Sequence, residues 1–209
     1  MKVIQPSYEI MTPIDGQAIL ALLEQCGRVC YKSEDKITEG SAEKFIANII
    51  KRGHEAVLEH YSITIRFIVD RGVSHEIVRH RLASYCQEST RYCNYSKEGF
   101  GGEITVILPP GMSKGARMSA WMLGCYWAEK AYFAMLDCGC TPQMARTVLP
   151  HSLKTEVIMT ANIREWRHFL RLRTAKAAHP QMREVTIPLL HELQAKVPVL
   201  FDDIKEEKK

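Results

Sequence analysis

The stretch LKTEVIMTANIREWRHFLRLR, residues 153–173, runs from a predicted strand directly into a predicted helix. Every second residue of its first part is expected to point into the core: Leu153, Thr155, Val157 and Met159. This period of two is typical of a strand with one buried face. Asn162 then suits the N-cap of a helix, and Glu165 three residues later completes a capping box in which an amide replaces the usual hydroxyl.

The helix after Asn162 is predicted to have two distinct faces. One face can be buried and carries the apolar side chains of Trp166, Phe169 and Leu170. Arg164, His168 and Arg171 follow one another at spacings of four and three residues, which places them together on another face. The sequence therefore predicts a helix that packs on one side and presents cationic groups on the other.

Strands and helices mix irregularly along the rest of the chain. We predict further strands at residues 62–67 and 103–108, a polar segment without periodicity at 53–60, a turn at 70–72 and a loop at 84–92. Helices are predicted from Ser41, as N-cap, to Arg52 with Gly53 as the stop, from Ser74, as N-cap, through Arg81, at about 113–137, from Thr141 to before Pro150, and at about 180–196. Without a regular βαβ rhythm, this order indicates an α+β fold with a largely antiparallel central sheet flanked by helices.

Length and composition fit one domain covering residues 1–209, with a charged, frayed tail at about 202–209. The net charge of +4 is mild, and its basic residues concentrate at 71–91 and 164–183, which favours a local anion site over a general nucleic-acid surface. The seven cysteines lack paired CxxC spacing, so we expect reduced thiols and a cytoplasmic protein. No segment has the apolar length of a membrane span or a signal core.

The densest group of polar side chains is RHRLASYCQESTRY, residues 79–92. Arginine grips phosphate through a planar charged fork, and hydroxyl and backbone N–H groups supply further short bonds. If the predicted helix continues through Arg81, then Arg79 and Arg81 point roughly 200° apart and address different ligands or different chains. The alternative is a solvated basic face, but Ser, Gln, Thr and Tyr interleave these arginines, which favours a site.

Other chemistries fit the residues less well. His54 and His60 lie six residues apart rather than the four of an HExxH zinc site, and we predict no metal. No cysteine has a recognisable neighbouring base, so we predict no thiol nucleophile. Gly99, Gly101 and Gly102 form no GxGxxG fingerprint, so a flavin or nicotinamide would be held by side chains in a non-Rossmann fold.

The pattern RHR, seven residues, Ser89 and then Arg91-Tyr92 closely resembles the signature of flavin-dependent thymidylate synthases. Three further blocks, in the same order as in that family, resemble its other conserved segments: residues 53–60, 145–150 and 162–173. The resemblance covers residues 53 to 183. It implies a homotetramer with active sites shared between subunits, which uses FAD, NADPH and methylenetetrahydrofolate to convert dUMP to dTMP.

The resemblance also implies the residues of the site. The FAD-binding set would be His54, Ala56, Arg79, His80, Arg81, Gln87, Asn162, Ile163, Arg164 and His168. The dUMP-binding set would be Glu76, Arg79, Gln87, Glu88, Ser89, Thr90, Arg91, Arg146 and Arg173. Gln87 stands where the family often has Glu, and His168 where some members carry Asn; both keep the capacity for hydrogen bonds.

Arg173 is the residue that we expect to be catalytic. Uracil C5 must become nucleophilic, and a cation held against the pyrimidine can favour the electron-rich anionic ring without a cysteine adduct. Two alternatives stay open. One is a nucleic-acid-binding module, although the acidic residues Glu76 and Glu88 interrupt the basic cluster that it would need. The other is a flavoprotein that oxidises NADPH without making thymidylate.

Overall fold

The computed structural model describes residues 1–112 and 114–206. Its strands are β1 (Lys2–Ile4), β2 (Ser7–Ile10), β3 (Ser62–Asp70), β4 (Ala83–Gln87), β5 (Thr105–Ile107) and β6 (Lys154–Asn162). Its α-helices are α1 (Gly16–Tyr31), α2 (Ser41–Lys51), α3 (Arg71–Ile77), α4 (Ala116–Asp137), α5 (Pro142–Ala145), α6 (Ile163–Arg173), α7 (Pro180–Lys196) and α8 (Pro198–Phe201). Its 3₁₀ helices are η1 (Glu34–Lys36), η2 (Glu55–His60), η3 (Glu98–Phe100) and η4 (Arg146–Val148).

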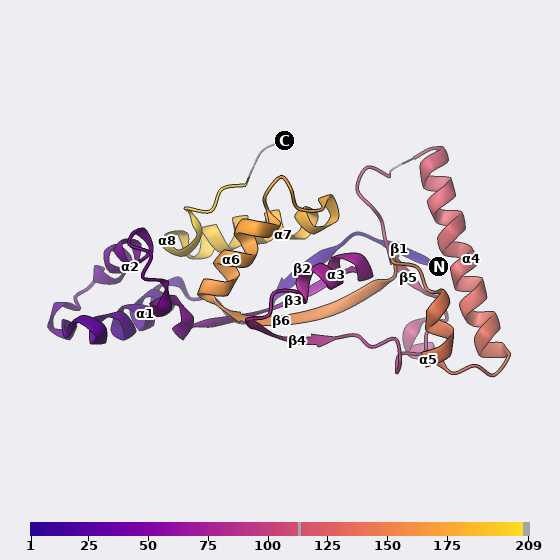
Figure 1. Cartoon of the computed structure of the whole chain (residues 1–209), viewed down its shortest axis with the longest axis horizontal. Coiled ribbons are helices and arrows are strands. Elements are labelled where there is room, and N and C mark those ends of the chain that lie inside the picture. The colour runs from indigo at the N-terminus through magenta and orange to yellow at the C-terminus, as the bar shows by residue number, and fades with distance from the viewer. Residues whose placement is uncertain (113, 207–209) are drawn as a thin grey trace. The chain divides into compact units, whose positions relative to one another are not determined.

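The fold is α+β, as predicted, with an antiparallel four-stranded sheet in the order β2-β3-β6-β4 (Figure 1). A separate pair, β1 and β5, is parallel, with Val3 opposite Val106. The chain divides into two compact units. Unit 1 consists of residues 1–7, 67–79 and 85–158, and unit 2 of residues 8–66, 80–84 and 159–209. The prediction of a single domain remains a prediction.

Unit 1 has its own apolar core between α4 and the β5 region. Cys125 and Tyr132 of α4 are buried together with Ile104, Val106 and Leu153. Gly139, with a φ of 85°, follows α4 in the left-handed region.

In unit 2, α6 is the central helix. Trp166, Phe169 and Leu170 are fully buried, which confirms the predicted apolar face. The Trp166 indole donates a hydrogen bond of 3.0 Å to the carbonyl of Ile63 in β3. α6 also contacts η2 and α7, so its orientation is fixed by several neighbours.

The predictions were most accurate where the hydrophobic period is strong. β3, β6, the Asn162 cap and α7 all occur, and the β5 strand and the long α4 helix are shorter than predicted. Ser113, the first residue of the predicted long helix, lies outside the described residues.

Two predicted helix starts were wrong. Ser41 is the first residue of α2, not its cap, because its hydroxyl donates to the buried Glu24 carboxylate and accepts from the Thr38 amide. Asp70 caps α3 by accepting from the Val73 amide at 2.7 Å, so residues 71–72 are helical and do not form the predicted turn.

The basic segment also differs from its prediction. α3 ends at Ile77, before Arg79, so the expected opposition of Arg79 and Arg81 around one helix axis does not arise. Residues 84–87 of the predicted loop belong to β4, which begins at Ala83. Segment 53–60 contains the six-residue 3₁₀ helix η2, whose tighter period the helical and strand templates do not match.

The C-terminal segment is more ordered than a frayed tail up to Glu206. Ile204 is buried, and the Asp203 carboxylate lies 2.7 Å from Nη2 of Arg167 on α6. The buried guanidinium of Arg167 therefore holds this segment in place. Residues 207–209 of the predicted tail lie outside the described residues.

Candidate functional site

The junction of β6 and α6 positions the most concentrated chemistry of unit 2. Asn162 ends the strand and caps the helix at once, because its side-chain oxygen accepts the Glu165 amide at 2.9 Å. The Ile163 amide donates to the carbonyl of Tyr61, and the Ile163 side chain is buried. This rigid start sets where Glu165, His168 and Arg173 project.

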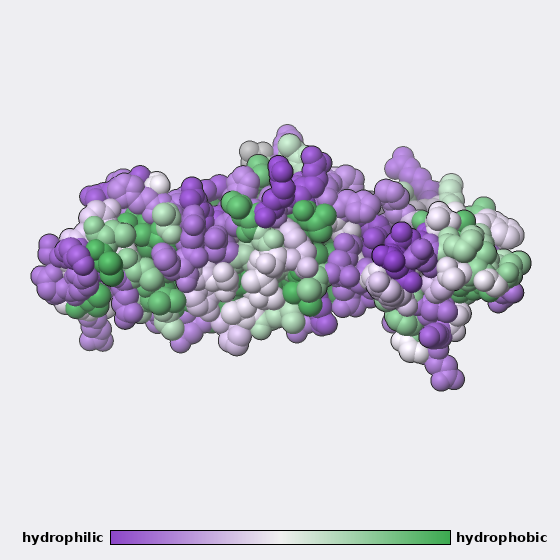
Figure 2. Space-filling view, turned by 60° about the horizontal axis from the view of Figure 1, so that its bottom comes forward, coloured by the Kyte–Doolittle hydropathy of each residue, from purple (hydrophilic) through white to green (hydrophobic). Residues whose placement is uncertain are grey.

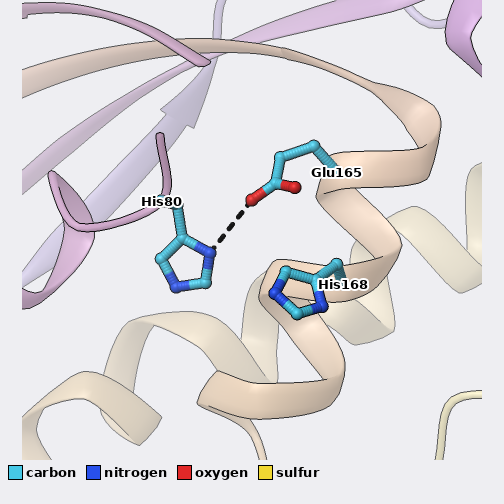
Figure 3. A group of neighbouring side chains, drawn as sticks. All are labelled: His80, Glu165 and His168. Atoms are coloured by element: carbon cyan, nitrogen blue, oxygen red, sulfur yellow. Dashed lines mark hydrogen bonds and ion pairs between the residues drawn. The ribbon is translucent and has the colours of Figure 1, made fainter. Parts of the chain in front are cut away.

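His80 lies against α6 and is joined to it at both ring nitrogens. Its Nδ1 lies 3.1 Å from Oε1 of Glu165 (Figure 3), and its Nε2 lies 3.0 Å from Nε of Arg173. The Nε of arginine only donates, so Nε2 of His80 must accept with its lone pair. The hydrogen of a neutral His80 is then on Nδ1 and is donated to Glu165.

The surroundings of His80 favour this neutral form. Burial lowers the pKa of His80 below its usual value, and the charges of Arg173 and His168 lower it further, although the hydrogen bond with Glu165 opposes them. Only 6% of His80 and 5% of Glu165 is exposed. The result is a chain of hydrogen bonds from Arg173 through uncharged His80 to the carboxylate of Glu165.

His168 completes this group from the exposed side of α6. Its ring centroid lies 5.7 Å from that of His80 (Figure 3). The ring of Phe169 packs edge-on against His80, with ring centroids 4.8 Å apart. Potential ligand atoms of His80, Glu165 and His168 lie within 4.8 Å of one another, a donor set that a metal ion could use. Arg173 at Nε2 of His80 weighs against a cation there, because like charges repel.

His54, Ala56, Arg81 and Arg164, four of the other predicted FAD residues of unit 2, are at the surface, but some are already bound within the chain. Arg81 and Ala56 are exposed. Arg164 forms an ion pair of 2.6 Å with Glu59, and Nδ1 of His54 shares a hydrogen bond of 2.8 Å with the hydroxyl of Tyr31. Glu55 and Glu59, which lie between His54 and His60, therefore both face Arg164.

Unit 1 contains an open pocket of about 250 Å³. Predicted dUMP residues Thr90 and Arg146 line it, together with Arg71, His75 and His151. The charged and titratable side chains among its described lining residues are thus guanidiniums and imidazoles, which suits an anion. The neighbouring Arg91 is exposed, and its Nε donates to Gln143, while its backbone amide donates to the hydroxyl of Ser89.

Two predicted dUMP residues are instead engaged in internal networks of unit 1. The Gln87 amide donates to the hydroxyls of Ser74 and Thr155 at 3.0 and 3.3 Å. The Glu88 carboxylate accepts from the hydroxyl of Tyr95 at 2.8 Å and from Nζ of Lys154 at 2.9 Å. Of the remaining predicted residues, Glu76 is half-buried on α3 and Arg79 is exposed just after it.

Sequence reasoning missed four residues of these two groups: Arg71, His75, His151 and Glu165. Glu165 was identified only as a capping residue, because its spacing from Asn162 explains it without His80. His75 and His151 pack edge-on with ring centroids 5.9 Å apart, although they lie on distant segments. In the sequence, the predicted site residues nearest to His75 and His151 are Glu76 and Arg146.

Within the part of the chain that the structure describes, no helix combines the length and apolar character that crossing a bilayer requires. None of the seven cysteines forms a disulfide. Burial is the largest cause that raises the pKa of the Cys93 thiol, and the charge of Glu88 raises this pKa further.

Comparison with known proteins identifies the family. The family described as "Thymidylate synthase complementing protein" matches residues 17–199. The flavin-dependent thymidylate synthase of Mycolicibacterium gilvum is 32% identical, over 96% of this chain and 84% of its own length. The corresponding protein of Geobacter sulfurreducens is also 32% identical, over 90% of this chain and 82% of its own length.

This chain belongs to the flavin-dependent thymidylate synthase family. A solved structure agrees on the fold: a UMP/dUMP methylase, PolB, from Streptomyces cacaoi, bound with 5-Br dUMP, superposes with a TM-score of 0.79. It covers 97% of this chain and 96% of its own, at 21% identity. The family resemblance drawn from the RHR signature and the three other blocks is thereby confirmed, and so is the enzyme class.

Proposed function

We propose that this chain converts dUMP to dTMP by reductive methylation, with methylenetetrahydrofolate as the carbon donor and Arg173 as the group that activates uracil. Family membership supports the reaction. The single observation that supports Arg173 is its contact with a buried, neutral His80, which holds a permanently charged guanidinium at a defined place on α6. A solvated arginine at the end of a helix would lack such a partner.

The role of Arg173 is electrostatic. A guanidinium beside N3 and the neighbouring carbonyl oxygen of uracil stabilises the ionised ring, because an adjacent opposite charge favours the charged form. The electron-rich ring then carries nucleophilic character at C5, where the new carbon bond forms. A preoriented charge does this without reorganisation at the moment of reaction.

The donors of unit 2 fit FAD. Arg81, which follows His80, and His168 on α6 are exposed cationic or hydrogen-bonding groups, and such groups suit the diphosphate and ring edges of a dinucleotide. We propose that they hold it together with His80, Arg164, Ile163 and the segment from His54 to Ala56. When bound and reduced by NADPH, FAD supplies the hydride, which no side chain can supply.

We propose that the phosphate of dUMP binds in the basic pocket of unit 1, at Thr90 and Arg146. Ser89, Arg91, Glu76 and Arg79 complete the proposed dUMP set from neighbouring segments. The family resemblance also assigns Gln87 and Glu88 to the dUMP set. Their internal hydrogen bonds support a structural role instead, in holding β4 and the segment that follows it.

We also propose a homotetramer with active sites shared between subunits. α4 presents exposed apolar side chains, with 57% of Leu123 and 62% of Trp127 accessible. Pale green, apolar surface is visible in the region of α4 (Figures 1 and 2). Contiguous exposed apolar side chains commonly mark protein interfaces. The free thiols are consistent with a cytoplasmic location, which we propose as well.

Replacing Arg173 tests the proposal. Arg173→Ala is expected to lower dTMP formation by about 10²- to 10³-fold, the usual effect of losing one preorganised charge contact. Arg173→Lys should recover little, because an ammonium cannot reproduce a planar two-pronged contact. Arg171→Ala, on the same helix, is the matched control. FAD content and NADPH oxidation are measured beside dTMP.

Two outcomes would contradict the proposal. Near-normal dTMP formation by Arg173→Ala removes Arg173 from the mechanism. A wild-type protein that binds FAD and oxidises NADPH but makes no dTMP with dUMP and methylenetetrahydrofolate is the flavoprotein oxidase instead.

A further inference from the structure

We propose that Glu165 is a positioning residue for Arg173 and acts through His80. The inference rests on the proposed role of Arg173. Glu165 has no assigned part in the site beyond its place three residues after the Asn162 cap. Three contacts carry the inference: Asn162 to the Glu165 amide, Glu165 to His80, and His80 to Arg173.

The first step is the choice of tautomer. Ionised Glu165 only accepts hydrogen bonds, so at 3.1 Å it stabilises the form of His80 with its hydrogen on Nδ1. That form leaves a lone pair on Nε2. The other tautomer, or the imidazolium ion, would turn an N–H group toward the N–H of Arg173 and break the 3.0 Å contact.

The second step is the orientation of the guanidinium. Arginine has a long, flexible side chain, but its Nε and both Nη atoms lie in one plane. Anchoring Nε to a buried ring nitrogen therefore restricts the plane in which the charge and the remaining donors lie. A two-pronged contact with a flat pyrimidine depends on that plane.

The third step is burial. His80 and Glu165 are both nearly inaccessible, so water does not compete strongly for their bond. The groups that face His80 include Glu165 and His168 (Figure 3) and also Arg173, and the ring of Phe169 packs edge-on against it. A carboxylate that merely stabilised the first turn of α6 would not need an imidazole between itself and Arg173.

The test compares Glu165→Gln and Glu165→Ala with Glu24→Gln. Glu24 is an equally buried carboxylate of unit 2 that binds Arg28 and Ser41, away from this cluster. In the FAD-loaded enzyme, Glu165→Ala is expected to lower kcat for dTMP by about 10- to 100-fold, as losing a residue that orients a functional group typically does. FAD content should remain near wild type. Glu24→Gln should change thermal stability but not kcat.

The pH profile separates positioning from a structural role. Protonation of His80 places an N–H at Nε2, so kcat should fall on the acid side as His80 becomes charged. Glu165 raises the pKa of His80 against the effect of burial. In Glu165→Gln the acid limb should therefore move to lower pH, whereas a structural defect leaves the limb in place.

Variants of His80 give a second readout. The side-chain oxygen of Gln can occupy the position of Nε2 and accept from Arg173 without titrating. His80→Gln is therefore expected to keep more activity than His80→Ala and to lose the acid limb that His80 causes.

Wild-type kcat and an unmoved acid limb in both Glu165 variants would overturn the inference, and so would loss of FAD from Glu165→Gln. If Arg173→Ala is inactive in the same series, the proposed function survives that result. If Arg173→Ala is active, the proposed function fails first.

Discussion

At the scale of single residues, the Cys93 thiol shows why this enzyme is not expected to use a cysteine nucleophile. Burial raises its pKa, and the charge of Glu88 raises it further, so the neutral thiol predominates at neutral pH. The thiolate is the reactive form. Cys86 is exposed on β4. These features agree with the proposal that the charge of Arg173 activates the uracil ring.

Cysteine replacement checks this point. Cys86→Ala, Cys93→Ala and the double variant should each form dTMP within about tenfold of wild type, while removal of a true covalent nucleophile costs on the order of 10⁴ or more. Initial rates at saturating dUMP measure the difference, with FAD content as the control for folding. A loss on the larger scale would restore a covalent route.

At the scale of elements, the C-terminal segment is held against α6 by the carboxylate of Asp203. Asp203 binds the fully buried Arg167 and, at 3.0 Å, the exposed Arg171. Burial by itself raises the pKa of Asp203, but its hydrogen bonds and charge interactions with Arg167 and Arg171 outweigh burial and hold the pKa below its usual value. The helix that carries Arg173 is thus braced from the C-terminal side.

Asp203→Asn is expected to lower the free energy of unfolding by about 1.5–3 kcal/mol, the usual contribution of hydrogen bonds to charged groups. The neighbouring exposed Asp202→Asn is the matched control. The stabilisation is present above the ordinary pKa of an aspartate and is lost as pH falls through the lowered value. Chemical denaturation at pH 7 should separate the two variants, and their difference should shrink toward pH 3. Equal stability at pH 7 would contradict the brace.

Sequence predicted the elements whose period is set by burial, and it failed where side chains decide the boundary. β6 and α6 follow their hydrophobic patterns closely. α3 begins four residues earlier than predicted because Asp70, not Ser74, supplies the cap, and that choice depends on which oxygen reaches a free amide. β4 was missed because none of its residues is fully buried, so no alternation of apolar side chains reports it, and it pairs within the sheet through its backbone.

The site shows the same division. The family blocks pointed to Thr90 and Arg146, which line the basic pocket of unit 1, and to His80 and Arg173, which contact each other in unit 2. Their assignment to a site remains a prediction. The hydrogen bond between Glu165 and His80 joins residues 85 positions apart, so no local sequence pattern could predict it. Long-range hydrogen bonds of this kind need the folded structure.

At the scale of the whole molecule, the exposed apolar face of α4 makes assembly testable. Trp127→Glu should shift the protein from a tetramer to smaller species, because a charge placed in an apolar contact is costly to bury. Val29→Glu, at a comparably exposed position on α1, is the matched control. Light scattering gives the mass, and dTMP formation should fall together with assembly if subunits share active sites. A wild-type monomer with full activity would contradict both statements.

The absence of any connecting loop between β6 and α6 has a consequence for evolution. Inserting one residue into the strand would exchange its buried and exposed faces, and inserting one after Asn162 would rotate Glu165 and Arg173 by about 100° around the helix axis. Neither change leaves a compensating segment to absorb it. We expect an alignment of many family members to contain no insertion or deletion between residues 154 and 173, with length variation gathering instead between β4 and β5. Frequent gaps within 154–173 would contradict the idea that the direct β6–α6 connection fixes the positions of Glu165 and Arg173.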